Sequence, residues 1–141
     1  MKTLKTVWQA PNSFHCGTAC FAMLADVSFD IAKSVLFGER NITTIGRKAL
    51  LKGLQKYSIV EIGSGRFTKK LCMRDLPNHA LVKGYLSDDS NDREWLHWVV
   101  WDAKQKVMRD PDGFQLPFRA TSYTTLDIPR TTVRKLARTG P

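Results

Sequence analysis

Three residues of the types used in nucleophilic catalysis stand out in this chain. Cys16 opens its most apolar helical stretch, His97 stands in the apolar segment 95–102, and Asp110 begins the turn sequence Asp-Pro-Asp-Gly. A thiol becomes a strong nucleophile when a helix N-terminus and a neighbouring imidazolium favour its ionised form. A carboxylate that accepts a hydrogen bond from the imidazole completes such a group. The types and their order predict a Cys16–His97–Asp110 triad.

Helical signals are confined to the first half of the chain. Turn and cap residues at 11–13 predict a helix that begins near Cys16, and residues 19–25 are apolar on every side, as in a central helix covered all round. A second helix is expected over 29–37, ending at Gly38. A third is expected over 44–57, with a buried face formed by Ile45, Ala49, Leu50, Leu54 and Tyr57.

The second half of the chain changes to the alternation of β-strands. Strands are expected over 58–62, 80–86, 96–102 and 106–109, with turns at 63–65, 87–92 and 103–105. Beyond residue 114 the pattern fades into short strands or coil. Alternation puts His97, Val99 and Trp101 on one sheet face, and Leu96, Trp98 and Val100 on the other. The expected fold class is α+β: N-terminal helices that carry Cys16, packed on an antiparallel sheet that carries His97 and Asp110.

Spacing within the last predicted hairpin brings two of the candidate residues together. If Ala103 and Lys104 form a two-residue turn, paired positions sum to 207 and Asp110 lies directly opposite His97. Asp110 then orients one ring nitrogen of His97. Asp112, in the same turn, is expected to cap its own backbone instead. The spacing does not determine how far Cys16 lies from His97.

Taken together, the segments resemble the papain-like cysteine peptidases that process bacteriocin precursors with double-glycine leaders, here in a stand-alone form. The matching segments follow in the family's order over roughly residues 5–115: Gln9…Cys16-Gly-Thr-Ala-Cys20-Phe-Ala-Met, Leu76-Pro77…Ala80-Leu-Val82, His97-Trp-Val-Val100 and Asp110-Pro-Asp-Gly113. The resemblance implies a papain-like fold. It also implies Cys16 as nucleophile, His97 as general base and acid, Asp110 as orienting residue and Gln9 as side-chain donor to an oxyanion hole.

The chain departs from that family at two positions. Six residues separate Gln9 from Cys16, where relatives usually have about five, so Asn12 remains an alternative oxyanion donor. Position 15 is His, where many relatives have an acidic residue. A cation at His15 would further favour a thiolate at Cys16; otherwise His15 shapes specificity.

Length and composition set outer bounds. The 141 residues, 43% hydrophobic and 25% charged, predict one domain with a core over about 5–128 and a loosely held basic tail over 129–141. No apolar run approaches the roughly eighteen residues of a membrane span. No secretory signal is recognised, so we expect a cytoplasmic location or export by a route without a signal peptide.

The net charge of +9 favours an acidic partner. Zinc-finger and helix-turn-helix patterns are lacking, so nucleic acid is not the expected partner.

The remaining cysteines and histidines are given structural interpretations. Cys20 and Cys72 are expected to be inert core residues, and His79 an ordinary surface histidine. Three cysteines, two of them on one helix, argue against disulfides. A zinc site is not expected, because the chain has no Cys-x-x-Cys pair, and no cofactor is expected. The tryptophans at 95, 98 and 101 are core and rim residues, one of which is expected to wall a substrate cleft.

The leading functional hypothesis is a hydrolase that cleaves an amide bond through Cys16 and an acyl-enzyme intermediate. The amide would lie in a protein, a leader peptide or a peptidoglycan peptide. Deamidation and transpeptidation use the same machinery and remain open. Two other classes also remain open: a catalytically silent peptidase-like module that binds a protein or peptide, and a basic nucleic-acid-binding protein.

Overall fold

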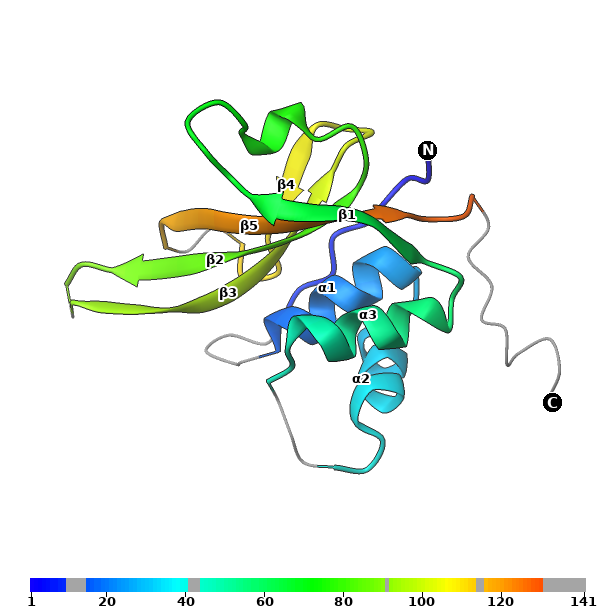
Figure 1. Cartoon of the computed structure of the whole chain (residues 1–141). Helices are drawn as coiled ribbons and strands as arrows, with labels where there is room; N and C mark the ends of the chain where they lie inside the picture. The colour runs from blue at the N-terminus through cyan, green and yellow to red at the C-terminus, as the bar shows by residue number, and fades with distance from the viewer. Residues whose placement is uncertain (10–14, 41–43, 91, 114–115, 131–141) are drawn as a thin grey trace, which may run out of the picture.

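A computed structural model describes residues 1–9, 15–40, 44–90, 92–113 and 116–130 (Figure 1). In these residues, helices α1 (Cys16–Ala25), α2 (Phe29–Phe37) and α3 (Arg47–Gln55) precede one antiparallel sheet. Its strands are β1 (Val60–Arg66), β2 (Ala80–Asp88), β3 (Arg93–Asp102), β4 (Val107–Arg109) and β5 (Phe118–Asp127), in the spatial order β1-β5-β2-β3-β4. A short 3-10 helix, η1 (Met73–Asp75), lies between β1 and β2. The α+β class is confirmed.

Helices α1 and α2 have the bounds expected from their sequences. Helix α1 is buried from Gly17 to Ala25, which confirms the central helix expected from its apolar sequence. Helix α2 has the expected bounds: the Ser28 hydroxyl accepts the Ile31 N–H at 3.2 Å, and the helix ends at Gly38 with φ of 62°. The capping residues expected at 11–13 lie outside the described residues.

Helix α3 is shorter than the expected 44–57. It begins after Gly46, and its buried face contains Leu50 and Leu54, whereas Ala49 is exposed. Gly53 brings α3 close to α1, since a Cβ there would lie 2.8 Å from the Phe21 ring. The residues of α3 that are buried are those on the side that packs against α1 at Gly53.

Strands β1 and β5 correct the sequence-based expectations. The stretch beyond 114 contains the ten-residue strand β5, which lies between β1 and β2 and pairs with both. The alternation of apolar and polar residues in β5 is weak, because Thr, Ser and Tyr fill most of its middle positions. These β-branched and aromatic residues nevertheless suit a strand that is paired on both edges. The turn expected at 63–65 is instead part of β1, where Gly65 lets the Tyr123 ring lie across the strand.

The two faces of the sheet carry separate cores, as the alternation in β3 predicts. Trp98 and Val100 join the main core, formed with the three helices, which lie together on one side of the sheet (Figure 1). Val99 and Trp101 face the other way and form a smaller core with Leu76, which follows η1. In the described part of the chain, no helix is long and apolar enough to span a bilayer.

His79 is buried, contrary to the expectation of a surface histidine. Its Nδ1 accepts the Ala103 N–H at 3.1 Å, so the neutral ring carries its proton on Nε2 and donates to the Lys2 carbonyl at 2.6 Å. The Asp102 carboxylate lies 3.7 Å from Nδ1. The ring therefore attaches the N-terminal segment to the β3–β4 turn, a long-range role that local sequence does not reveal.

Replacing His79 should test that attachment. His79→Leu removes the hydrogen bonds that His79 makes with the Ala103 N–H and the Lys2 carbonyl, so we expect the free energy of unfolding to fall by about 1–3 kcal/mol in urea denaturation. His79→Gln, whose amide both accepts and donates, should lose less. Equal stability of His79→Leu and the unchanged protein would contradict this role.

Candidate active site

Cys16 is the first residue of α1 and lies at the electropositive end of a buried helix. Its neighbour His15 occupies the cap position but makes no side-chain capping hydrogen bond. The first N–H groups of a helix have no intrahelical partners, and the terminus carries a partial positive charge. The Cys16 thiol and the Cys16 N–H therefore lie where negative charge is stabilised.

Gly17 determines how closely the start of α1 approaches the sheet. A Cβ at this position would lie 2.6 Å from Cγ2 of Ile45 and 3.5 Å from Cδ1 of Trp98. The missing side chain lets the helix start pack directly on β3 through Trp98. This packing brings the α1 terminus beside the strand that carries His97.

His97 is buried in β3 at a point where that strand loses its outer neighbour. Strand β4 pairs only with Val100–Asp102, so the β3 edge beyond it is not covered by β4. On the other edge, Gly84 of β2 lies opposite His97, and the Phe118 ring meets the imidazole edge-on at 5.8 Å between centroids. The ring of His97 therefore has one crowded flank and one flank open to residues from elsewhere in the chain.

Asp110 begins the turn that follows β4 and contacts His97 directly. Its Oδ1 lies 2.7 Å from His97 Nε2 and also accepts the Asp112 N–H at 2.8 Å. The Gly113 N–H closes the turn onto the Asp110 carbonyl at 3.1 Å, with Gly113 at φ of 72°. The turn holds a buried carboxylate against the ring, and it is Asp110, not Asp112, whose side chain does so.

The hairpin register that predicted this contact is wrong, although the contact is present. Val100 pairs with Arg109, so paired positions sum to 209 rather than 207. The turn has four residues because the buried Asp102 accepts the N–H groups of Lys104 and Gln105, both at 3.0 Å. The favoured two-residue turns need positive φ at one or both positions, which Ala and Lys disfavour. Asp110 is consequently diagonal to His97 and still reaches it.

The third candidate, Cys16, contacts the same imidazole. The Cys16 side chain lies close enough to the ring to help raise the pKa of His97, through hydrogen bonding and charge. Because Nε2 faces Asp110, Nδ1 is the nitrogen left for the thiol. Burial disfavours the charged ring, but the hydrogen bonds and charges of Asp110 and Cys16 outweigh it and raise the pKa of His97 from 6.5 to about 9. At neutral pH the ring is therefore an imidazolium between a carboxylate and a sulfur.

The raised pKa of His97 has a definite sign for stability. The folded protein holds the His97 proton more tightly than the unfolded chain does, so protonated His97 stabilises the fold. This contribution to the free energy of unfolding is complete below pH 6.5 and is lost as the pH rises through about 9.

The other thiols differ sharply from Cys16. Cys20 is buried, as expected, and its burial, with the charges of Cys16 and Asp110, raises the pKa of the Cys20 thiol well above its usual value. Cys72 was expected in the core but is exposed, beside η1. Cys20 is therefore suited to packing and Cys72 to ordinary surface reactivity.

Gln9 lies beside the Asp110 turn. Its N–H donates to the Pro111 carbonyl at 3.0 Å, and its side-chain Oε1 is buried. The structure thus brings Gln9 to the part of the molecule that holds His97 and Asp110, while its role as oxyanion donor stays a prediction. The alternative donor, Asn12, lies outside the described residues.

His15 does not supply the cation considered from the sequence. Partial burial and the charge of Lys33 lower the pKa of His15 below 6.5, so the ring is neutral at neutral pH. Its edge packs on the Phe29 ring at 5.4 Å between centroids. His97 is the imidazolium next to Cys16.

Gly84 and Phe118 flank the site and were not recognised from the sequence. A Cβ at Gly84 would lie 2.2 Å from the Arg119 carbonyl oxygen and 2.7 Å from the Phe118 ring. Phe118 thus occupies the space above Gly84 and supports His97 from the side. A glycine in the strand before the one that carries His97 was the sequence signal for Gly84, which pairs with His97 in the β2–β3 hairpin. Phe118 could not be recognised in this way, because it comes from strand β5, which the sequence did not predict.

No group of three or more His, Cys, Asp and Glu side chains in the described residues is arranged to hold a metal ion.

A scan against protein-family models and a search of curated proteins find no match to this chain. Functional assignment therefore depends on the geometry of the site.

The His97–Asp110 contact can be tested by titration. Asp110→Asn removes the negative charge, so the pKa of His97 should fall from about 9 by roughly 1–3 units. The ring resonances of His97 in NMR spectra recorded against pH report this value. Asp112→Asn is the matched control: the Asp112 carboxylate acts on His97 through its charge alone, so the pKa should fall much less. An unaltered pKa in Asp110→Asn would contradict the assignment of Asp110 as the partner.

Proposed function

We propose that this protein is a papain-like cysteine hydrolase that cleaves an amide bond through Cys16, His97 and Asp110. One observation carries the proposal: the imidazole of His97 contacts the Asp110 carboxylate at 2.7 Å on Nε2 and the Cys16 side chain on its other side. The three groups come from α1, β3 and the turn after β4. A buried imidazolium next to a thiol is typical of activated cysteine nucleophiles.

The first half of the reaction forms the acyl-enzyme. The Cys16 thiolate attacks the amide carbonyl, and the negative charge on the carbonyl oxygen is stabilised by the Cys16 N–H and the Gln9 side chain. The His97 imidazolium gives its proton to the leaving nitrogen as the C–N bond breaks. The amine departs, a thioester joins the acyl group to Cys16, and His97 is left neutral.

The second half returns the enzyme to its starting state. Formation of the thioester removes the thiolate, one of the charges that raise the pKa of His97. The pKa of the ring therefore falls towards the working pH. A neutral ring is then available to accept a proton from water as general base. Hydroxide adds to the thioester, the C–S bond breaks, and the carboxylic acid leaves. Asp110 keeps Nε2 protonated throughout, so that Nδ1 carries out both proton transfers.

The architecture also supports a papain-like assignment. A nucleophile at the start of a buried helix, packed on an antiparallel sheet that carries the base, is the arrangement implied by the resemblance to bacteriocin-processing peptidases. The substrate class proposed is a protein or peptide amide, including a peptidoglycan peptide. Trapping the acyl-enzyme and identifying the bound acyl group by mass spectrometry would name the substrate.

Thiol labelling tests the proposed ion pair without any substrate. At pH 6 exposed Cys72 serves as the reference thiol and should react slowly with iodoacetamide. Cys16 should react much faster, and buried Cys20 slowest. His97→Ala is the control and should reduce the rate at Cys16 towards that at Cys72. Equal rates at Cys16 and Cys72 in the unaltered protein would overturn the proposal.

Turnover of a proteome-derived peptide library, followed by mass spectrometry, tests the catalytic roles. Cys16→Ala should abolish cleavage. Asp110→Asn should reduce it by up to about 10⁴-fold, the loss seen when a triad loses its orienting carboxylate. Gln9→Ala should reduce kcat by about 10²–10³-fold, as for one oxyanion donor. Asp112→Asn, the matched control, should cleave nearly normally. Near-normal cleavage by Gln9→Ala would remove Gln9 from the oxyanion hole.

A further inference from the structure

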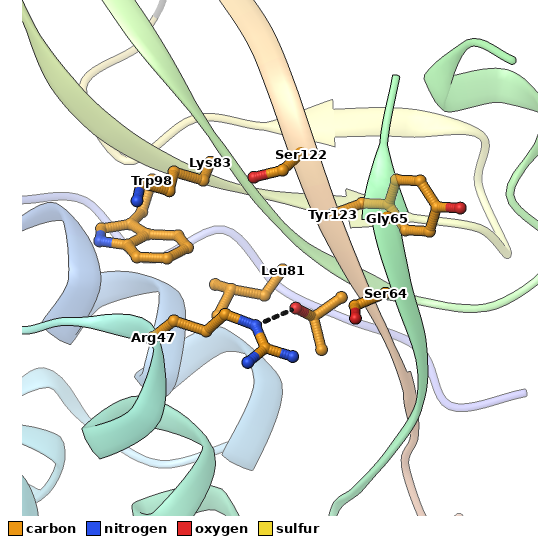
Figure 2. A pocket seen from close by; sticks show the side chains of 9 residues that line it. Arg47, Ser64, Gly65, Leu81, Lys83, Trp98, Ser122 and Tyr123 are labelled. Atoms are coloured by element: carbon orange, nitrogen blue, oxygen red, sulfur yellow. Dashed lines mark hydrogen bonds between the residues drawn. The ribbon is translucent and has the colours of Figure 1, made fainter. Parts of the chain in front are cut away.

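A pocket of about 150 Å³ lies on the helix-facing side of the sheet, beside Trp98 (Figure 2). Its floor consists of two neighbouring rows of paired strand residues. Lys83 of β2 pairs with Trp98 and Ser122, and Thr124 of β5 pairs with Ser64 of β1 in the next row. Arg47, at the start of α3, closes the pocket on the helix side.

The lining of the pocket combines apolar side chains, including Leu81 and Trp98, with two cations and several hydroxyl groups. Arg47 and Lys83 contribute positive charge, Ser64, Ser122 and Thr124 contribute hydroxyls, and no carboxylate is among the lining residues. Figure 2 shows the Lys83 side chain next to Trp98, with its Nζ 5.9 Å from the indole centroid. Such a lining favours an anion that accepts several hydrogen bonds.

The two cations have different tasks. The Arg47 Nε donates to Thr124 Oγ1 at 2.9 Å, and its terminal nitrogen pairs with Glu61, so Arg47 is fixed in place and largely neutralised. Lys83 forms no ion pair with any described acidic residue. Lys83 is therefore the group that an incoming anion would meet.

The pocket is small and partly open to solvent. Its volume of about 150 Å³ accommodates the end of one side chain, such as a carboxylate.

The pocket shares its walls with the start of α1. Trp98 lines the pocket and also packs on Gly17, the residue after Cys16. Ile45, which contacts the same glycine, stands two residues before Arg47. A peptide whose amide lies at Cys16 would therefore have a neighbouring side chain close to Lys83.

From this placement we infer that the pocket binds the carboxylate of an aspartate or glutamate side chain, near the scissile amide of a peptide substrate. The part of this inference that concerns substrate rests on the proposed hydrolase function. The carboxylate site itself does not, because it follows from the charge and the hydrogen-bonding groups of the pocket lining.

Binding is measured on the Cys16→Ala protein, so that catalysis plays no part. N-acetylglutamate amide and N-acetylglutamine amide are titrated separately, and the Trp98 indole and the Ser122 and Thr124 amide resonances are followed by NMR. A charge-assisted hydrogen bond exceeds a neutral one by roughly 1.4 kcal/mol, so the glutamate probe should bind about tenfold more tightly. Equal affinities, or shifts confined to other resonances, would overturn the carboxylate site.

Lys83→Gln should weaken binding of the glutamate probe about tenfold. Lys52→Gln is the matched control, since Lys52 is exposed on α3 and does not line the pocket. Unchanged binding by Lys83→Gln would overturn the role of Lys83. Inorganic phosphate forms a third arm, and tighter binding of phosphate than of the glutamate probe would overturn the assignment to an acidic side chain. The comparison of the two probes on one protein stands even if Lys83→Gln fails to fold.

The peptide-library cleavage pattern connects the pocket to the substrate. We expect acidic residues to be enriched within a few positions of the cleaved bond, and Lys83→Gln to remove that enrichment. Cys16-dependent cleavage without acidic enrichment would overturn this inference and leave the proposed hydrolase intact. Probe binding without any cleavage would overturn the hydrolase, and with it the substrate part of the inference, and leave the carboxylate site intact.

Discussion

Helix α1 is buried from Gly17 to Ala25, and its packing against β3 determines where the candidate catalytic residues lie. A buried helix cannot shift or rotate without exposing apolar surface or opening cavities, each of which costs stability. Because Gly17 presents no side chain, the first turn approaches Trp98 closely. Cys16 is thereby held beside His97, past the point where β4 ends.

Burying charged groups at this site costs free energy, which the structure offsets through one oxygen of Asp110, Oδ1, while Oδ2 is buried without a described hydrogen-bond partner. His97 and Asp110 are each only 2% exposed, and taking such charges out of water is unfavourable unless they are paired and hydrogen-bonded. The pairing is close, and the Asp112 N–H provides Asp110 with a second donor. That the pKa of His97 rises to about 9 despite burial means that its partners outweigh the cost of desolvation. Burial, together with the charges of Cys16 and Asp110, raises the pKa of Cys20, which keeps the neighbouring thiol protonated.

The positive charge of the protein acts at two ranges in the proposed function. The net charge of +9 attracts acidic partners over distances of about a Debye length, without regard to their sequence. Lys83 acts only on a group that enters the pocket beside Trp98. General attraction and local recognition would therefore favour the same acidic segments, the first through encounter rate and the second through placement of the amide.

The amino-acid sequence by itself determined the elements whose signals are local. The apolar run after Cys16 and the terminating Gly38 indicated α1 and α2, and the alternation in β3 assigned the two sheet faces. The contact between His97 and Asp110 was also predictable, because a short hairpin keeps them neighbours even when the register shifts by two.

Only the tertiary structure decided the features that depend on distant partners. The buried Asp102 lengthens the β3–β4 turn, and β1 and β2 together stabilise a strand β5 of weak alternation. His79 is buried because the N-terminal segment crosses it. The meeting of Cys16 with His97, and the pocket at Lys83, combine residues from separate helices and strands. Local sequence cannot encode such distances, because they result from how whole elements pack against one another.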